Sequence, residues 1–184
     1  MLRFASKVAL KAMGWKSEGS FPPDLKKYVV IVAPHTSGWD FVIGLFFRKA
    51  LHLEKARYLG KQELFRPPFG FFFRWLGGYP VDRSSRHNLV DQVVRIFNEH
   101  EEFAIALSPE GTRQRVDKLK TGFYNIALAA HVPLIMVAFD YRNKRAIIAE
   151  PLQLTGDQPR DFEKILSFFR PIQGKYPEKG LMHL

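Results

Sequence analysis

The chain has 184 residues, 46% of them hydrophobic, which suits one folded domain with one core. It contains no cysteine, and this excludes disulfides, thiol nucleophiles and thiolate metal sites. Its 28 lysines and arginines against 18 acidic residues give a net charge of +10, which favours an anionic partner: nucleic acid, an anionic membrane surface or a phosphorylated substrate.

Residues 1–16 predict a basic amphipathic helix, because Arg3, Lys7 and Lys11 recur at helical spacing beside small apolar residues. The helix is either an interfacial membrane anchor or a terminal helix packed on the domain. No stretch approaches the roughly 20 apolar residues that span a bilayer, and the start lacks the apolar centre of a signal peptide. We therefore expect a cytoplasmic protein, peripheral on the inner membrane surface.

A loop, a strand and a helix are predicted next. Residues 17–27 carry paired prolines and a glycine, which oppose regular structure. The β-branched run at 28–33 predicts a strand, and residues 41–53 predict an apolar helix. We expect His35 at the end of this strand and Asp40 on the first turns of the helix. A carboxylate at the start of a helix can hold one imidazole nitrogen while the other acts as a base on a hydroxyl.

Aromatic side chains concentrate at residues 65–76, after a short predicted strand at 56–60. Several of the 17 phenylalanines of the chain fall there, which is more than one helix face needs for packing. The stretch is either a surface that enters a bilayer or lines an acyl-chain channel, with Arg66 and Arg74 near the headgroups, or a buried aromatic cluster.

The rest of the chain alternates strands with helices. A brief strand precedes Asp82, and further strands are predicted at 103–108, 132–139 and 145–150, with helices at 87–100, 123–131 and 157–169. This alternation predicts a single α/β domain over residues 1–184, with a mixed, largely parallel sheet flanked by helices.

Pairs of polar residues fall at three predicted strand ends, where open α/β sheets bind their ligands. The pairs are His35 with Asp40, Asp82 with Arg83, and Glu110 with Arg113. Each pair alone is more often a structural hydrogen bond or a surface ion pair than a functional site. Their order along the chain is the more specific signal.

Four ordered blocks resemble those of the glycerolipid acyltransferases, the lysophosphatidate acyltransferase-like superfamily. The blocks are the HX4D motif from His35 to Asp40, residues 78–83, residues 108–113 and residues 132–135. With their flanks they cover about residues 28–140. The chain has no Gly-x-Ser-x-Gly elbow to present a serine nucleophile and no His-Glu-x-x-His motif for a metal.

The resemblance implies an O-acyltransferase of membrane lipid biosynthesis. It would move a fatty acyl group from acyl-carrier protein or acyl-CoA to the hydroxyl of a lysophospholipid such as 1-acylglycerol-3-phosphate. His35 would be the general base, oriented by Asp40, with direct transfer and no acyl-enzyme. The implied substrate-binding residues, with the arginines on the acceptor's phosphate, are Lys61, Arg83, Glu110, Gly111, Thr112 and Arg113. No metal or other cofactor is implied.

Other interpretations of the function stay open beside the acyltransferase. Pro34, Ser108 and Ala138 stand where the family commonly has other residues, so a lysophospholipid other than lysophosphatidate, or a lyso-aminolipid, is an alternative acceptor. A non-catalytic lipid-binding protein would share the membrane-seeking features. A nucleic-acid-binding domain would explain the charge and the aromatics but not the ordered blocks. We therefore expect lipid, acyl-donor and membrane partners and no nucleic acid.

Overall fold

The computed structural model describes residues 2–82 and 86–184. Its strands are β1 (Lys16–Glu18), β2 (Lys27–Ala33), β3 (Ala56–Lys61), β4 (Gly78–Val81), β5 (Phe103–Leu107), β6 (Leu134–Asp140) and β7 (Arg145–Ile148). They form one seven-stranded sheet in the order β1-β7-β6-β2-β5-β3-β4. Every neighbouring pair is parallel except β6 with β7, which is antiparallel. The predicted mixed, largely parallel sheet is confirmed.

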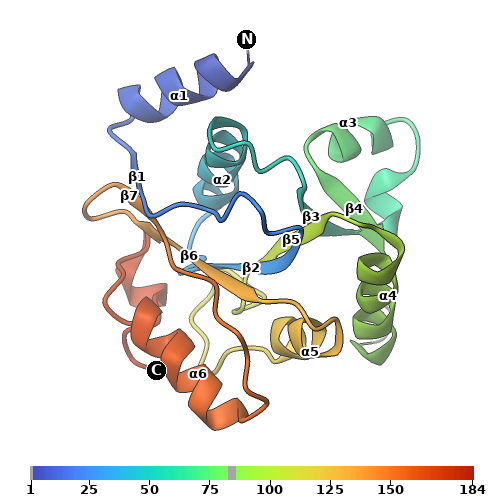
Figure 1. The fold of residues 1–184 in the computed structure, drawn as a ribbon. Coiled ribbons are helices and arrows are strands. Elements are labelled where there is room, and N and C mark those ends of the chain that lie inside the picture. Colours follow the sequence, from blue (N-terminus) through green and yellow to red (C-terminus); the bar gives the residue numbers. More distant parts are fainter. Residues whose placement is uncertain (1, 83–85) are drawn as a thin grey trace.

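Helices cover both faces of the sheet (Figure 1). They are α1 (Leu2–Ala12), α2 (Trp39–Ala50), α3 (Gly70–Trp75), α4 (Arg86–Glu99), α5 (Gly122–Ala129) and α6 (Gln158–Phe169), with short 3₁₀ helices at Gln62–Phe65 and Pro177–Lys179. In Figure 1, α1, α2 and α3 lie over one face, and α4, α5 and α6 lie over the other. Parallel strands need such crossovers, since a tight turn cannot join them.

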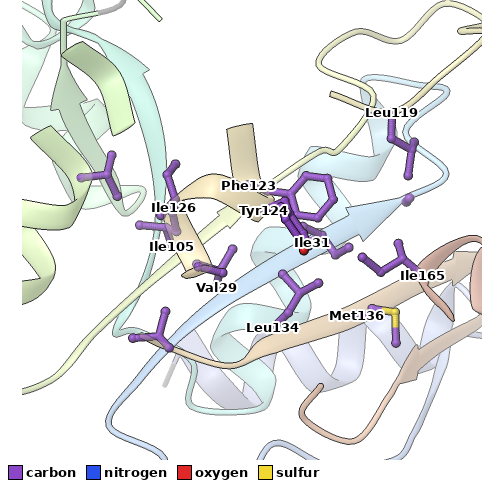
Figure 2. Close-up of a cluster of buried hydrophobic side chains, with 14 of the residues drawn as sticks. Val29, Ile31, Ile105, Leu119, Phe123, Tyr124, Ile126, Leu134, Met136 and Ile165 are labelled. Atoms are coloured by element: carbon purple, nitrogen blue, oxygen red, sulfur yellow. The ribbon is translucent and has the colours of Figure 1, made fainter. Parts of the chain in front are cut away.

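The two faces carry separate apolar cores, because successive side chains of a strand point to opposite sides. On one face, Val29 and Ile31 of β2 pack with Phe123 and Ile126 of α5 (Figure 2). On the other face, Val30 packs with residues of α1 and α2. An unbroken apolar strand such as β2 is what burial on both faces requires.

The first strand departs from the expected loop at 17–27. Lys16–Glu18 pairs in parallel with β7, and Nη1 of Arg145 donates to both carboxylate oxygens of Glu18 at 3.0 and 3.1 Å. The loop prediction is therefore wrong at its start. A short, exposed and polar edge strand has no apolar alternation by which a sequence pattern could reveal it.

Helix α1 packs on α2 with one side and leaves the other uncovered. Ser6 and Leu10 are buried, whereas Leu2, Phe4 and Val8 are exposed. The helix ends at Ala12, earlier than expected. Within the part of the chain that the structure describes, no helix is long and apolar enough to cross a membrane.

The aromatic stretch after β3 divides into packed and exposed side chains. Phe65 is buried and contacts Phe73, with 6.2 Å between their ring centroids. In contrast, Phe71 of α3 is 74% exposed and Trp75 is 60% exposed, and Phe69 and Phe72 are exposed as well. A buried aromatic cluster therefore describes only part of this stretch, and α3 presents an aromatic surface.

Candidate active site

The turn after β2 and the loop after β5 meet at one edge of the sheet, because these adjacent strands are parallel. The backbone N–H of His35 donates to Oε1 of Glu110 at 2.7 Å. Arg113 of the loop after β5 also approaches the turn after β2. Its Nη1 lies 3.2 Å from the position that a Cβ would take at Gly38. Two of the ordered sequence blocks thus form one site.

His35 and Asp40 form a hydrogen-bonded pair in this site. Nδ1 of His35 lies 3.1 Å from Oδ2 of Asp40, which also accepts the backbone N–H groups of Thr36 and Ser37, each at 2.9 Å. The hydroxyl of Tyr141 donates to Oδ1 at 2.6 Å. Because an ionised carboxylate only accepts hydrogen bonds, Nδ1 carries the proton and Nε2 is left as a proton acceptor.

Burial separates the roles of the two side chains. Asp40 is 3% exposed, whereas 26% of the His35 side chain is accessible. The carboxylate is thus fixed in the protein, at the first turn of α2, and the imidazole can reach a bound molecule. This arrangement can remove a proton from a hydroxyl.

Glu110 uses both of its oxygens within the chain. Oε1 accepts the His35 N–H, and Oε2 accepts the hydroxyl of Ser108 at 2.7 Å. Burial raises the pKa of the Glu110 carboxyl above its ordinary value of 4.5, and these two hydrogen bonds offset part of that rise. At 1% exposure, Glu110 holds the backbone at His35 in place.

We expect Glu110→Gln to fold nearly as stably as the wild type and Glu110→Ala to lose about 1–3 kcal/mol, because alanine leaves the part-buried His35 N–H without its partner. The free energy of unfolding of the glutamine variant should also rise relative to that of the wild type as pH rises above 4.5. The folded state keeps the Glu110 proton to higher pH than the unfolded state, so ionisation lowers wild-type stability in that window. Urea unfolding at several pH values measures both effects, and equal loss in the two variants would contradict this role.

Two cations flank the loop after β5. Arg113 and Lys120 line the same cavity as His35, together with Gly111 and Thr112. Gly111 has φ +67°, and Cγ of Lys120 lies 3.3 Å from the position of a Cβ there. Cations so placed can bind a phosphate group. Lys120, Thr121 and Gly122 also resemble residues of the family, but the sequence did not place Lys120 among the binding residues, because a basic loop does not reveal which cation turns back toward the site.

Of the other predicted binding residues, Lys61 is not part of this cluster. Lys61 ends β3 and is exposed, and it is absent from the described residues that line the cavity. Asp82 follows β4 at the edge of the sheet, and its backbone N–H donates to Gln92 Oε1 at 3.1 Å. Arg83 lies outside the described residues, so its role on a phosphate stays a prediction. Across residues 2–82 and 86–184, no group of three or more acidic or histidine side chains is placed to hold a metal ion.

An apolar cavity of about 740 Å³ is lined by His35, by residues of α2 and the sheet, and by Leu89 of α4 and Phe123 of α5. Small residues make the room for it: Gly44 on α2, Ala56 on β3 and Ala106 on β5. Further apolar residues of the lining are Phe21, Leu51, Leu53, Ala146 and Ile148. A proton acceptor and two cations therefore line the same cavity as these apolar side chains.

Comparison with known proteins agrees with the geometry. Residues 16–140 match the family model described as Acyltransferase. The 1-acyl-sn-glycerol-3-phosphate acyltransferase of Escherichia coli (strain K12) is 32% identical over 133 residues, which cover 67% of this chain and 52% of that protein. The enzyme of the same name from Streptococcus pneumoniae (strain ATCC BAA-255 / R6) is 27% identical over 119 residues, 64% of this chain and 43% of that protein. The chain thus spans about half the length of these curated relatives.

A solved structure shares the fold. The crystal structure of the 1-acyl-sn-glycerophosphate (LPA) acyltransferase PlsC from Thermotoga maritima superposes with a TM-score of 0.61 at 20% identity, covering 89% of this chain and 74% of that one. The family model covers well over half of the chain, and it includes both blocks that form the site. The chain therefore belongs to the acyltransferase family, within the lysophosphatidate acyltransferase-like superfamily that its ordered blocks predicted.

Proposed function

We propose that this chain transfers a fatty acyl group from a thioester, acyl-CoA or acyl-carrier protein, to the hydroxyl of a lysophospholipid of the 1-acylglycerol-3-phosphate type. The observation that carries the proposal is the His35–Asp40 pair in the lining of the apolar cavity, which Arg113 and Lys120 line as well. The names of the relatives support the acceptor class. The cavity supplies room for an acyl chain, and the cations supply partners for a phosphate.

In this proposal His35 acts as a general base and Asp40 as its orienting carboxylate. Nε2 takes the proton of the acceptor hydroxyl while the oxygen of that hydroxyl attacks the thioester carbonyl carbon. The new C–O ester bond forms, the C–S bond breaks, and the imidazolium returns the proton to the thiolate. Asp40 stabilises the transient imidazolium, and Glu110 keeps the His35 backbone in position. No acyl-enzyme is needed, since the acceptor itself is the nucleophile.

The test is product analysis by mass spectrometry with matched acceptors. Purified protein is given acyl-CoA or acyl-carrier protein with 1-acylglycerol-3-phosphate, with 1-acylglycerol lacking the phosphate, or with a lyso-aminolipid. We expect a diacylated phosphate product and free thiol. Equal rates with and without the phosphate would contradict the acceptor class. Lipid binding without any product would favour the non-catalytic lipid-binding alternative.

The length of acyl chain accepted should shorten in Gly44→Met, because the methionine side chain would extend into the cavity. A Cβ at Gly44 meets only Phe139, whose Cζ would lie at an ordinary contact distance of 3.7 Å. Gly44→Ala is therefore the matched control, expected to keep the chain-length preference and to gain up to about 1 kcal/mol in helix stability. Competition among acyl-CoA donors of increasing length measures the preference, and an unchanged preference in Gly44→Met would place the acyl chain elsewhere.

We further propose that the protein works peripherally on the cytoplasmic surface of an anionic membrane, with α3 as its contact. The exposed rings of Phe71 and Trp75 lie beside the cavity wall, since Tyr58 of that wall donates to the carbonyl oxygen of Phe73 at 3.2 Å. Aromatic rings with nearby cations such as Arg74 suit the headgroup level of a bilayer. An acceptor lipid would then reach the site without leaving the membrane surface.

In vesicle flotation, we expect the double variant Phe71→Ser, Trp75→Ser to bind at least about tenfold more weakly than the wild type, because two apolar rings no longer enter the interface. The control is Phe4→Ser, which tests the outer side of α1 by itself without disturbing its packing on α2. If the α3 variant floated with anionic vesicles as well as the wild type, α3 would not be the membrane contact. A loss in Phe4→Ser alone would assign the contact to α1.

A further inference from the structure

Tyr141 is joined to the active-site pair, although it lies outside the residues that match the family model. It directly follows β6, one residue beyond the matched range 16–140. Its hydroxyl donates to Oδ1 of Asp40 at 2.6 Å, across 101 positions of sequence. The end of β6 therefore supports the first turn of α2.

The two oxygens of Asp40 have different partners. Oδ2 accepts from His35, Thr36 and Ser37, and among the described residues Oδ1 accepts from Tyr141. A carboxylate with all its donors on one oxygen can rotate about its Cβ–Cγ bond and share them between both oxygens. The Tyr141 hydroxyl opposes that rotation, and so it keeps Oδ2 directed at the imidazole.

Tyr141 is itself held from two sides. Its ring meets the buried ring of Trp15 edge-on, with centroids 5.0 Å apart at 90°. Its backbone N–H donates to the carbonyl oxygen of Gln173 at 2.9 Å. Burial, and the hydrogen bond to Asp40, raise the pKa of the Tyr141 hydroxyl, so it stays a protonated donor over the whole neutral range.

We propose that Tyr141 is a positioning residue: it fixes the Asp40 carboxylate so that His35 keeps its proton on Nδ1 and presents Nε2 as the base. This inference rests on the proposed function. Tyr141 would not touch substrate, so its loss should change the chemical step and leave substrate binding nearly intact.

The test compares Tyr141→Phe with a matched pair elsewhere in the chain. Phenylalanine keeps the ring against Trp15 and removes only the hydroxyl. We expect kcat to fall about 10- to 100-fold, as for a lost hydrogen bond to a charged group, with KM for both substrates within about twofold. Tyr124→Phe is the control, because Tyr124 donates to the buried Asp161 at 3.0 Å on the other face of the sheet. It should lose stability to a similar degree and keep kcat.

A second measurement needs no substrate. Nitrogen-15 NMR of the His35 ring reports which nitrogen carries the proton, and we expect the Nδ1–H fraction to fall in Tyr141→Phe but not in Tyr124→Phe. An unchanged tautomer, or an equal loss of kcat in both variants, would overturn the inference. In the wild type itself, the Tyr141 hydroxyl proton should exchange slowly, and fast exchange would also overturn it. Absence of acyl transfer in a wild type with the expected tautomer would contradict only the proposed function.

Discussion

His35→Ala should lower kcat for acyl transfer by about 10²–10⁴-fold, the usual contribution of a general base, while the fold survives. The imidazole is part exposed and lines the cavity, so its removal leaves no large void in the core. Its backbone N–H, which Glu110 accepts, remains in alanine. Steady-state assay of thiol release, with circular dichroism to check the fold, measures the effect.

The matched control for this variant is His52→Asn. His52 is exposed at the end of α2 with φ +58°, a conformation that asparagine tolerates, and it does not line the cavity. We expect wild-type kcat from it. If His35→Ala transferred acyl groups at the wild-type rate, the proposed mechanism would be wrong even if the lipid specificity held.

Asp40→Asn should cost about 10³–10⁴-fold in kcat, the loss seen when an orienting carboxylate of a histidine base is neutralised. An amide can place its oxygen toward Thr36 and Ser37 only by turning its NH₂ toward the Tyr141 hydroxyl, which must then accept. The substitution keeps the size of the side chain but removes the charge that stabilises the imidazolium. Single-turnover kinetics isolates this loss from product release.

Asp161→Asn supplies the control for Asp40→Asn. Asp161 is buried and accepts from the backbone N–H groups of Thr155 and Gly156 and from the hydroxyl of Tyr124, a similar set of donors on the other face of the sheet. Its variant should unfold at lower urea concentration and keep kcat. A loss of kcat as large as that of Asp40→Asn would mean that stability, and not orientation, explains both results.

The sequence predicted the order of the elements because each central strand is an apolar run with a turn signal at its end, as in residues 28–33 before Pro34. It also correctly placed His35 at the end of a strand and Asp40 on the first turn of a helix. It missed β1, which is polar and exposed. In the aromatic stretch, composition could not separate the buried Phe65 from the exposed Phe71, because both are the same residue type in one run.

Contacts between distant segments limited how much of the site could be predicted from the sequence. Glu110 was expected at the acceptor, yet its oxygens face His35 and Ser108, a relation that depends on β2 and β5 being neighbours. Tyr141 carried no signal at all, since a tyrosine after an apolar strand has no distinguishing spacing. Three-dimensional pairing of strands, and not local pattern, decides which side chain supports which.

The strand order has a consequence for local opening of the fold. The groups around the base come from the ends of β2, β5 and β6, three adjacent strands inside the sheet, whereas β1 and β4 are its edges. Strand edges open most readily, and amide hydrogen exchange is slowest in the central strands. We therefore expect faster amide exchange at Asp82, at the end of β4, than at His35 and Asp40. A single sheet can thus combine edge strands that open readily with a candidate site held by its central strands.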